Sequence, residues 1–435
     1  MLLIEPSPSR RLFRRSIAGA LVALAFGVWT ASASAQGVCD PDGTQASGSI
    51  YRICMPSAEY NGMLVIWAHG FQDAGTPVSI PEDQLCQNDF CLPDIVTGLG
   101  FAFATNSYSK TGLAVLQGKS DILDLVQTFT AQKGKPKKVY LVGASEGGLI
   151  TALSLEQSPN VFAAGTAACG PVGDFPLQIN YFGDARVTFE YFFPGLFPGS
   201  IFDPDPNVVA NFFDYYETTI KPVVFDPANR HQLDQWVKAA NLPFDAGDYL
   251  VTVERSVRDA LRYSVVNIKD AAATLGGVPF ENRARWYGGS DNDFLLNIFV
   301  PRFAADPAAV ATMKASYNTT GILSRPLITL HTLRDQQVPY VHEQIYDWKT
   351  LFSGSFLTRH LNIPVDRYGH CNFTKDEALF SFVVMLFYDG VLDLVSGTSA
   401  ALAPAEQVAF ETRAKAAGLP TKRAGAALAL KLKQR

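Results

Sequence analysis

One serine stands in a sequence context that suits nucleophilic chemistry. Ser145 lies in Gly143-Ala144-Ser145-Glu146-Gly147-Gly148, between the apolar run Val139 to Val142 and a segment of helical character. A sharp strand-to-helix turn holds such a serine in a strained conformation, and side chains at the flanking glycines would collide with neighbouring backbone. The hydroxyl then projects at a helix N-terminus, where backbone N–H groups can stabilise an oxyanion. The motif therefore predicts attack by Ser145 on a carbonyl carbon.

This strand, serine turn and helix resemble the nucleophile turn of the α/β-hydrolase superfamily. The resemblance covers most of the chain outside a long insertion and the C-terminal tail, and it implies the chain order serine, acid, histidine. It places the acid at Asp335, within Leu330 to Pro339, and the base at His370, within Tyr368-Gly369-His370-Cys371-Asn372-Phe373. The implied activity is that of a serine hydrolase.

Each residue type suits its role in such a triad. A serine hydroxyl is a poor nucleophile until a base takes its proton, and histidine exchanges protons near neutral pH. The carboxylate fixes the imidazole tautomer and stabilises the imidazolium. Of the six histidines only His370 has the required position, the alternative being an ordinary loop histidine. Asp366 and Asp293 are the rivals of Asp335 for the role of the acid.

The resemblance also implies an oxyanion hole. Trp67-Ala68-His69-Gly70-Phe71 is similar to the family's His-Gly-x loop, which assigns the main-chain donors to Phe71 and Glu146, with Gln72 as the neighbour that could replace Phe71. His69 is expected to brace this loop. A carboxylate at Glu146 departs from the family pattern, because it would repel an oxyanion unless its side chain turns away or is paired.

The six cysteines predict disulfides rather than a metal site. Their even number in an oxidising compartment favours bridges, and no Cys-x-x-Cys or histidine-rich spacing suggests zinc. Proximity in the chain favours two local pairs, which would leave a third: Cys39 with Cys54, Cys86 with Cys91, and Cys169 with Cys371. The alternative for Cys169 is a buried free thiol.

Alternating apolar runs and helical patterns predict the elements that hold these residues. They indicate an α/β fold with a mostly parallel central sheet and helices on both faces. The expected strands are 63–68, 101–105, 139–142, 161–168, 326–330 and 358–365, and the expected helices are 113–130, 147–156, 341–351 and 377–391. The hydrolase core is therefore expected over residues 36–170 and 326–397.

Residues 171–325 interrupt this alternation and are expected to form a cap. Fourteen of the 51 residues from Phe175 to Phe225 are Phe or Tyr, against 12% aromatic residues in the whole chain. Most such rings serve packing. Some should still face the cleft, where a cap would decide which substrates enter.

The composition and the two terminal segments indicate which partners the protein can bind and in which compartment it acts. A chain of 435 residues with 48% hydrophobic residues is globular, and 36 basic against 41 acidic residues give no general grip on nucleic acid. Residues 1–35 combine Arg10, Arg11, Arg14 and Arg15 with an apolar run too short to span a bilayer, which predicts a signal peptide similar to twin-arginine signals. A membrane anchor is the alternative. The mature chain should be secreted or periplasmic, without a membrane-spanning segment, and its Ala-rich basic tail, 398–435, poorly packed.

These features predict a secreted serine hydrolase of carboxylic esters. The substrate would be a small or polymeric ester with apolar or aromatic groups, and neither cofactor nor metal is expected. One alternative is an amidase or exopeptidase on the same fold, with Asp203, Asp205 and Asp214 binding a free amine. The other is a noncatalytic binding protein that keeps the hydrolase fold.

Overall fold

The structure is a computed structural model that describes residues 37–87 and 90–391, together with 408 and 412. The expected signal peptide, 1–35, lies outside the described residues, as does the expected tail, 398–435, apart from positions 408 and 412. Among the helices of the described part, none is both long enough and apolar enough to cross a membrane.

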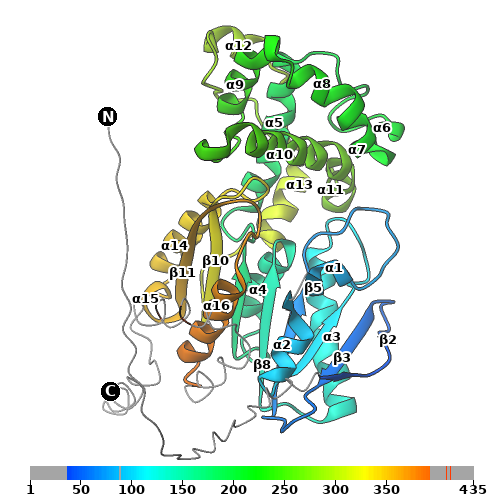
Figure 1. The fold of residues 1–435 in the computed structure, drawn as a ribbon, viewed down its shortest axis with the longest axis vertical. Coiled ribbons are helices and arrows are strands. Elements are labelled where there is room, and N and C mark those ends of the chain that lie inside the picture. The colour runs from blue at the N-terminus through cyan, green and yellow to red at the C-terminus, as the bar shows by residue number, and fades with distance from the viewer. Residues whose placement is uncertain (1–36, 88–89, 392–407, 409–411, 413–435) are drawn as a thin grey trace, which may run out of the picture. The chain divides into compact units, whose positions relative to one another are not determined.

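A mixed, mostly parallel sheet forms the centre of the fold (Figure 1), which confirms the predicted fold class. Its order is β1-β3-β7-β4-β8-β9-β10-β11, with β2 paired to β3. Strands β1, β2 and β3 pair antiparallel, and the pairings from β7 across to β11 are parallel. The strands are β1 Val38–Cys39, β2 Gly43–Thr44, β3 Ile50–Met55, β4 Met63–Ala68, β7 Ala102–Asn106, β8 Lys138–Ala144, β9 Ala164–Ala168, β10 Leu327–Arg334 and β11 His360–Tyr368.

Helices cover both faces of the sheet, because the central strands are apolar on both sides. Leu64 and Ile66 of β4 face the core that contains the buried side chains of α3 Val115–Lys133, α4 Glu146–Gln157 and α14 Val341–Phe352. Val65 and Trp67, on the opposite face, belong to the core shared with α2 Leu92–Gly98 and α16 Lys375–Tyr388. The period of two along β4 thus builds two separate cores.

Several boundaries differ from the sequence expectation by up to four residues, and two of these differences have clear local causes. Helix α16 begins at Lys375, two residues earlier than predicted, because Thr374 and Glu377 form a capping box. Thr358 and Arg359 belong to the short helix α15 Phe356–Arg359, so β11 begins only at His360. The sequence also missed helix α1 Glu82–Leu85 and the hairpin of β5 Cys86–Gln87 and β6 Phe90–Cys91.

The register of the strands brings the loops of interest to one edge of the sheet. Ala68 at the end of β4 lies opposite Gly143 of β8, and Ala144 lies opposite Ala168 at the end of β9. Arg334 at the end of β10 lies opposite Tyr368 at the end of β11. The loops that follow these strands therefore emerge at the same carboxyl edge, where α/β proteins place their ligands.

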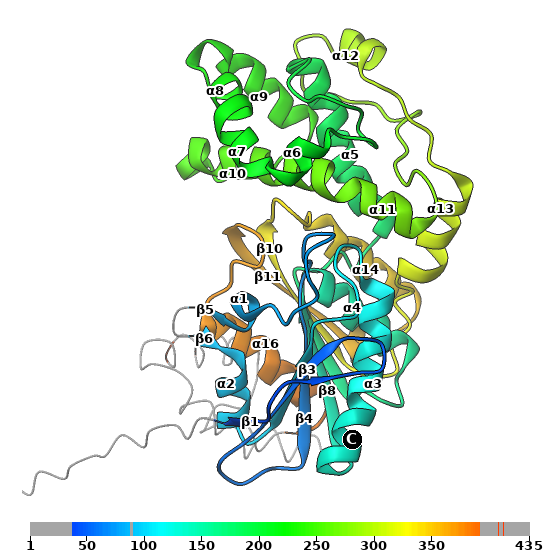
Figure 2. The ribbon, with the colours of Figure 1, turned by 90° about the vertical axis from the view of Figure 1, so that its right-hand side faces the viewer.

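The segment between β9 and β10 is helical, and Figure 2 shows its helices beyond the carboxyl edge of the sheet. Most of its aromatic rings pack against each other: Phe189, for example, contacts Phe193, Phe197 and Trp236, and all four rings are buried. Its elements are α5 Phe175–Phe192, α6 Pro206–Ala210, α7 Phe212–Tyr215, η1 Tyr216–Ile220, α8 Lys221–Val224, η2 Pro227–Asn229, α9 Arg230–Ala239, η3 Ala246–Asp248, α10 Tyr249–Arg262, η4 Tyr263–Asn267, α11 Ile268–Leu275, α12 Asp293–Phe299, α13 Pro307–Thr312 and η5 Met313–Tyr317. We refer to this segment as the cap.

Three disulfides join the six cysteines in the pairs that chain proximity favoured, Cys39–Cys54, Cys86–Cys91 and Cys169–Cys371. The first joins β1 to β3, and the second joins β5 to β6. The third connects the residue after β9 with the loop after β11, across 202 positions of sequence.

Candidate active site

Ser145 occupies a strained turn between β8 and α4. Its backbone angles, φ 58° and ψ −121°, lie in a region that residues other than glycine rarely adopt. A Cβ on Gly143 would lie 2.2 Å from the carbonyl oxygen of Gly147, and one on Gly147 would lie 2.0 Å from that of Ala68. The glycines are therefore sterically required on both sides of the serine.

The second and third predicted triad residues are hydrogen-bonded to each other. His370 Nδ1 lies 2.8 Å and 3.0 Å from the two carboxylate oxygens of Asp335. The rival Asp366 is exposed and pairs with Arg334, and the rival Asp293 accepts hydrogen bonds from Ser290 in the cap. With Nδ1–H donating to Asp335, Nε2 is left to accept a proton.

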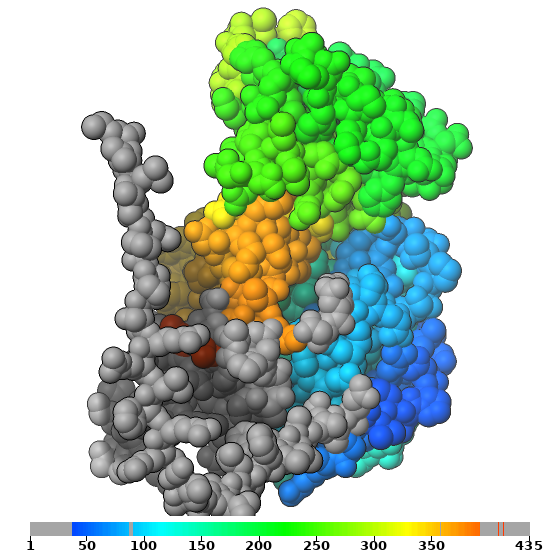
Figure 3. Space-filling model, viewed as in Figure 1, coloured from blue at the N-terminus to red at the C-terminus, as the bar shows by residue number. Residues whose placement is uncertain are grey.

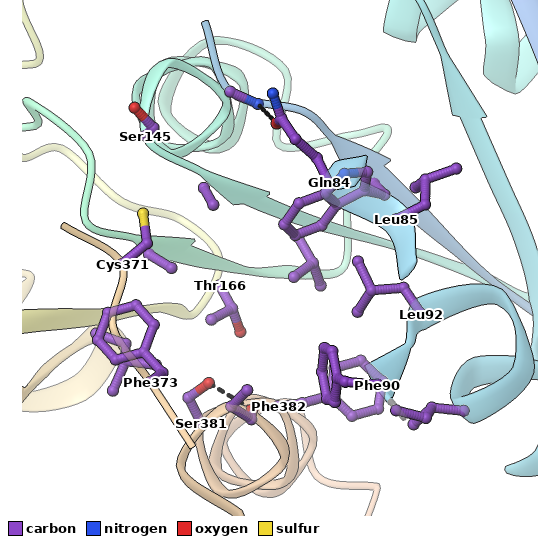
Figure 4. Close-up of a pocket in the computed structure, with 18 of the residues that line it drawn as sticks. Gln84, Leu85, Phe90, Leu92, Ser145, Thr166, Cys371, Phe373, Ser381 and Phe382 are labelled. Carbon is purple, nitrogen blue, oxygen red and sulfur yellow. Dashed lines mark hydrogen bonds between the residues drawn. The ribbon is translucent and has the colours of Figure 1, made fainter. Parts of the chain in front are cut away.

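Ser145 and His370 line the same cavity, which has a volume of about 790 Å³. Figure 4 shows the Cys371 sulfur pointing toward the side where Ser145 lies, and that sulfur is 3.5 Å from His370 Nε2. Within the described residues, no hydrogen bond joins the Ser145 hydroxyl to Nε2. Bonds of this kind commonly form or tighten only when substrate binds.

Asp335 is buried in a set of donors that favours its ionised form. Its Oδ1 accepts hydrogen bonds from the backbone N–H groups of Gln337 and Val338 at 2.8 and 2.9 Å. Burial alone would raise its pKa, but the charge of His370 and the hydrogen bonds from His331 and His370 outweigh burial and hold the pKa well below its usual range. The carboxylate therefore stays charged and can orient His370.

A buried histidine and glutamate extend this arrangement beyond the predicted triad. His331 Nε2 lies 3.3 Å from Asp335 Oδ2, and His331 Nδ1 lies 3.0 Å from Glu343 Oε1. Asn362 Nδ2 donates to the second oxygen of Glu343 at 3.0 Å. Burial would lower the pKa of His331, but its hydrogen bonds to Asp335 and Glu343 raise it to about 10. A buried imidazolium thus stands between two carboxylates.

The sequence patterns pointed to neither His331 nor Glu343 as part of the site. The spacing of four between His331 and Asp335 was visible, but its meaning depends on the loop that follows β10. Glu343 reaches His331 from α14, a contact that no local pattern signals.

The side chain of Glu146 turns away from the nucleophile. Its Oε1 accepts a hydrogen bond of 2.7 Å from the backbone N–H of Ala114, at the start of α3. Burial raises its pKa to about 8, which the hydrogen bond from Ala114 and the charge of Lys110 only partly counteract. At neutral pH the carboxyl group is therefore mostly uncharged, and the repulsion of an oxyanion is largely removed.

The loop expected to hold the oxyanion is braced from two directions. Gly70 N–H donates to Gln84 Oε1 at 2.6 Å, a contact drawn in Figure 4 that the sequence did not reveal. His69 is buried, stacks on Tyr108 and has Nδ1 2.7 Å from the Gly70 carbonyl oxygen. Burial lowers the pKa of His69 to about 4, so it is neutral and has a structural role.

The two N–H groups predicted to form the oxyanion hole belong to Phe71, in this loop, and Glu146, at the start of α4. Phe71 lines the large cavity together with Ser145, and Glu146 is the first residue of α4, so its N–H has no acceptor within the helix. Their action as the oxyanion hole remains a prediction.

A second cavity of about 100 Å³ lies between Ser145 and the cap. Its lining includes Glu146, Leu149 of α4, Ile179 of α5, and Ile268 and Ala271 of α11. The nucleophile therefore adjoins a large cavity and a small one.

Gly147→Ala should prevent the serine turn from forming. The added methyl would meet the Ala68 carbonyl oxygen, so we expect a loss of about 3 kcal/mol of unfolding free energy or more, measured by urea denaturation. Gly98→Ala is the control, because a Cβ there meets no atom within 4 Å. Equal stability of the two variants would contradict the steric requirement.

Glu146→Gln should alter how stability depends on pH. The folded-state pKa of about 8 exceeds the ordinary 4.5, so the native carboxyl group holds its proton while the unfolded chain loses it, and stability falls as the pH rises between these values. The variant lacks this ionisation. Its melting temperature relative to the wild type should therefore increase from about pH 5 to about pH 8. A constant difference would argue against a raised pKa.

His331→Gln should destabilise the protein more than the double variant His331→Gln/Glu343→Gln. The single change leaves Glu343 as a buried charge without its imidazolium, and breaking a buried pair costs about 3–5 kcal/mol. The double change removes that charge as well. Urea unfolding of both single variants and the double variant at neutral pH measures the coupling. Strictly additive losses would mean that the two side chains do not interact.

Comparisons with known proteins give one family match and several structural neighbours. Residues 94–175, which include the serine turn, match the model of the prolyl oligopeptidase family. No curated protein matches the sequence. Solved structures with a similar fold include the acylaminoacyl peptidase of Pyrococcus horikoshii, at 9% identity and a TM-score of 0.41 over 81% of this chain and 41% of that one. The chain thus spans about two fifths of that peptidase.

Two further structures are similar over more of their own length. Candida antarctica lipase A in its closed state has 15% identity and a TM-score of 0.37, over 80% of this chain and 76% of that one. An esterase of Pyrococcus furiosus has 11% identity and a TM-score of 0.39, over 83% and 94%. The sheet order, the strained serine turn after β8 and the match of residues 94–175 lead to one conclusion: the chain has the α/β-hydrolase fold.

Proposed function

We propose that the protein is an exported serine hydrolase that cleaves carboxylic esters with apolar or aromatic groups. The observation that carries this proposal is the pair of Asp335 and His370 beside a serine held in a strained turn, with the serine and the histidine lining one cavity. A signal peptide at 1–35, followed by secretion or passage to the periplasm, is part of the proposal and is supported by the sequence pattern and the three disulfides.

The residues support a two-step reaction. Ser145 Oγ attacks the ester carbonyl carbon while His370 Nε2 takes its proton, and the N–H groups of Phe71 and Glu146 donate to the oxyanion. The carbon–oxygen bond to the alcohol then breaks, and His370 returns the proton to the leaving oxygen. Water, deprotonated by His370, then attacks the acyl carbon. The bond from that carbon to Ser145 Oγ breaks, the acid leaves, and His370 returns the proton to Oγ. Asp335 holds the imidazole in the tautomer that this exchange needs.

The amidase alternative receives less support from the cap. Asp203 is exposed and pairs with Lys269, and Asp205 caps α6 through the backbone N–H of Asn207. Neither of them nor Asp214 lines either cavity. The match of residues 94–175 to a peptidase family keeps amide substrates in the test.

We expect p-nitrophenyl acetate to be turned over at least about tenfold faster than an aminoacyl p-nitroanilide, judged by kcat/KM. Ser145→Ala should lower ester turnover about 10⁴-fold or more, because the acyl-enzyme can no longer form. An organophosphonate should label Ser145, as located by mass spectrometry. Faster anilide turnover would favour the amidase, and the absence of both turnover and a Ser145 adduct would favour a binding protein.

A further inference from the structure

The two cavities that meet at Ser145 differ in size and in origin. The larger, of about 790 Å³, has room for a drug-sized group, and the smaller, of about 100 Å³, has room for about three water volumes. Both are lined by Phe71, Ser145, Tyr263 and Gln337. An ester bound at Ser145 therefore meets strongly unequal space on its two sides.

The walls of the large cavity come almost entirely from the core. Tyr263 is its only lining residue from 171–325, while Phe90 and Leu92 come from the disulfide-bonded hairpin and the start of α2, and Ala378 and Phe382 come from α16. Figure 4 shows the labelled side chains of Phe90, Leu92 and Phe382 gathered at one end and Ser145 at the other. The sequence suggested that the cap would decide substrate choice, but most of the available space lies away from the cap.

A cleft of this size beside a nucleophile is suited to bind a ligand. Ligand sites in proteins are typically concave spaces of about 300–1,000 Å³ with mainly apolar walls and a few polar groups. Because Ser145 and His370 lie on its wall, part of a substrate is the occupant that the position favours.

The positions of two residues indicate which side of the ester enters which cavity. His370 lines only the large cavity, and Glu146 lines only the small one. The leaving alcohol oxygen must lie within reach of His370 Nε2 to receive its proton. The acyl group stays on Ser145, and its carbonyl oxygen faces the N–H groups of Phe71 and Glu146.

We propose that the substrates are esters of a short acyl group with a bulky apolar alcohol or phenol. The acyl group, of about two to four carbon atoms, occupies the small cavity beneath the cap, where Ile179, Ile268 and Ala271 limit its length. The alcohol portion occupies the large cavity along α2 and α16. This inference rests on the proposed ester hydrolysis and specifies the substrate class of the same site.

Two alanines offer a matched pair of variants. Ala378 of α16 lines the large cavity, and Ala271 of α11 lines the small one. Ala378→Phe and Ala271→Phe add the same side chain on opposite sides of Ser145. Neither residue belongs to the proposed catalytic machinery.

Two substrate series separate the sides of the ester. One varies the alcohol at constant acetyl, from ethyl acetate to 2-(2-naphthyl)ethyl acetate, so that both leaving groups are primary alkoxides, and the other varies the acyl group at constant p-nitrophenol, from acetate to hexanoate. In the wild type, we expect kcat/KM in the alcohol series to rise at least about tenfold from the ethyl to the bulky ester. In the acyl series, we expect kcat/KM to fall at least about tenfold once the acyl group is longer than butyrate.

Ala378→Phe should lower kcat/KM for 2-(2-naphthyl)ethyl acetate at least about tenfold and leave kcat/KM for ethyl acetate within about threefold. Ala271→Phe should lower kcat/KM for p-nitrophenyl butyrate relative to p-nitrophenyl acetate by a similar factor and leave the preference among alcohols unchanged. Melting temperatures and the rate of Ser145 labelling by a small phosphonate check that each variant is folded and has an intact nucleophile.

The outcomes distinguish this inference from the proposed function. If no ester is cleaved and Ser145 is not labelled, the proposed function itself fails. If esters are cleaved but Ala378→Phe changes the acyl preference, or changes neither preference, the assignment of the cavities is wrong and the proposed function stands. An unchanged alcohol preference is also the result expected if another segment of the chain fills the large cavity.

Discussion

The contact between Gly147 and the carbonyl of Ala68 is the constraint on which the site depends. It lets the start of α4 pack directly on the end of β4, so that Ser145 can take its positive φ between β8 and α4. The loop proposed to hold the oxyanion begins at the next residue, His69. One close backbone approach therefore sets both the position of the nucleophile and the start of the loop beside it.

Burial acts in opposite ways on the acidic groups around this turn. At Glu146 burial raises the pKa, and the backbone hydrogen bonds and the charge of Lys110 only partly counteract it, so the carboxyl group is mostly uncharged at neutral pH. Asp335 is equally enclosed but faces two histidines and two backbone N–H groups, so it remains ionised. Two carboxyl groups near one serine thus take different protonation states, because their hydrogen-bond partners differ.

Local sequence patterns were informative where a feature depends on neighbours in the chain. The apolar run 139–142 and the glycines around Ser145 predicted both the turn and its steric cause, and the segments around Asp335 and His370 placed two side chains that the structure joins.

Contacts between segments that lie far apart in the chain could not be predicted from such local patterns. Glu343 meets His331 only because α14 packs against β11, the strand next to β10, and Gln84 reaches Gly70 from a helix that the sequence did not predict. The wall of the large cavity includes the β5–β6 hairpin, which the sequence did not predict, and α16. The concentration of aromatic residues in the cap had instead suggested that the cap would form the substrate site.

The Cys169–Cys371 disulfide encloses the whole cap within one covalent ring. In the chain-entropy view, closing a loop across 202 positions contributes about 5 kcal/mol to stability. The ring also has a consequence for resistance to proteolysis. A protease that cuts once anywhere between the two cysteines leaves two fragments that stay bonded beside His370, so the halves of the sheet cannot diffuse apart.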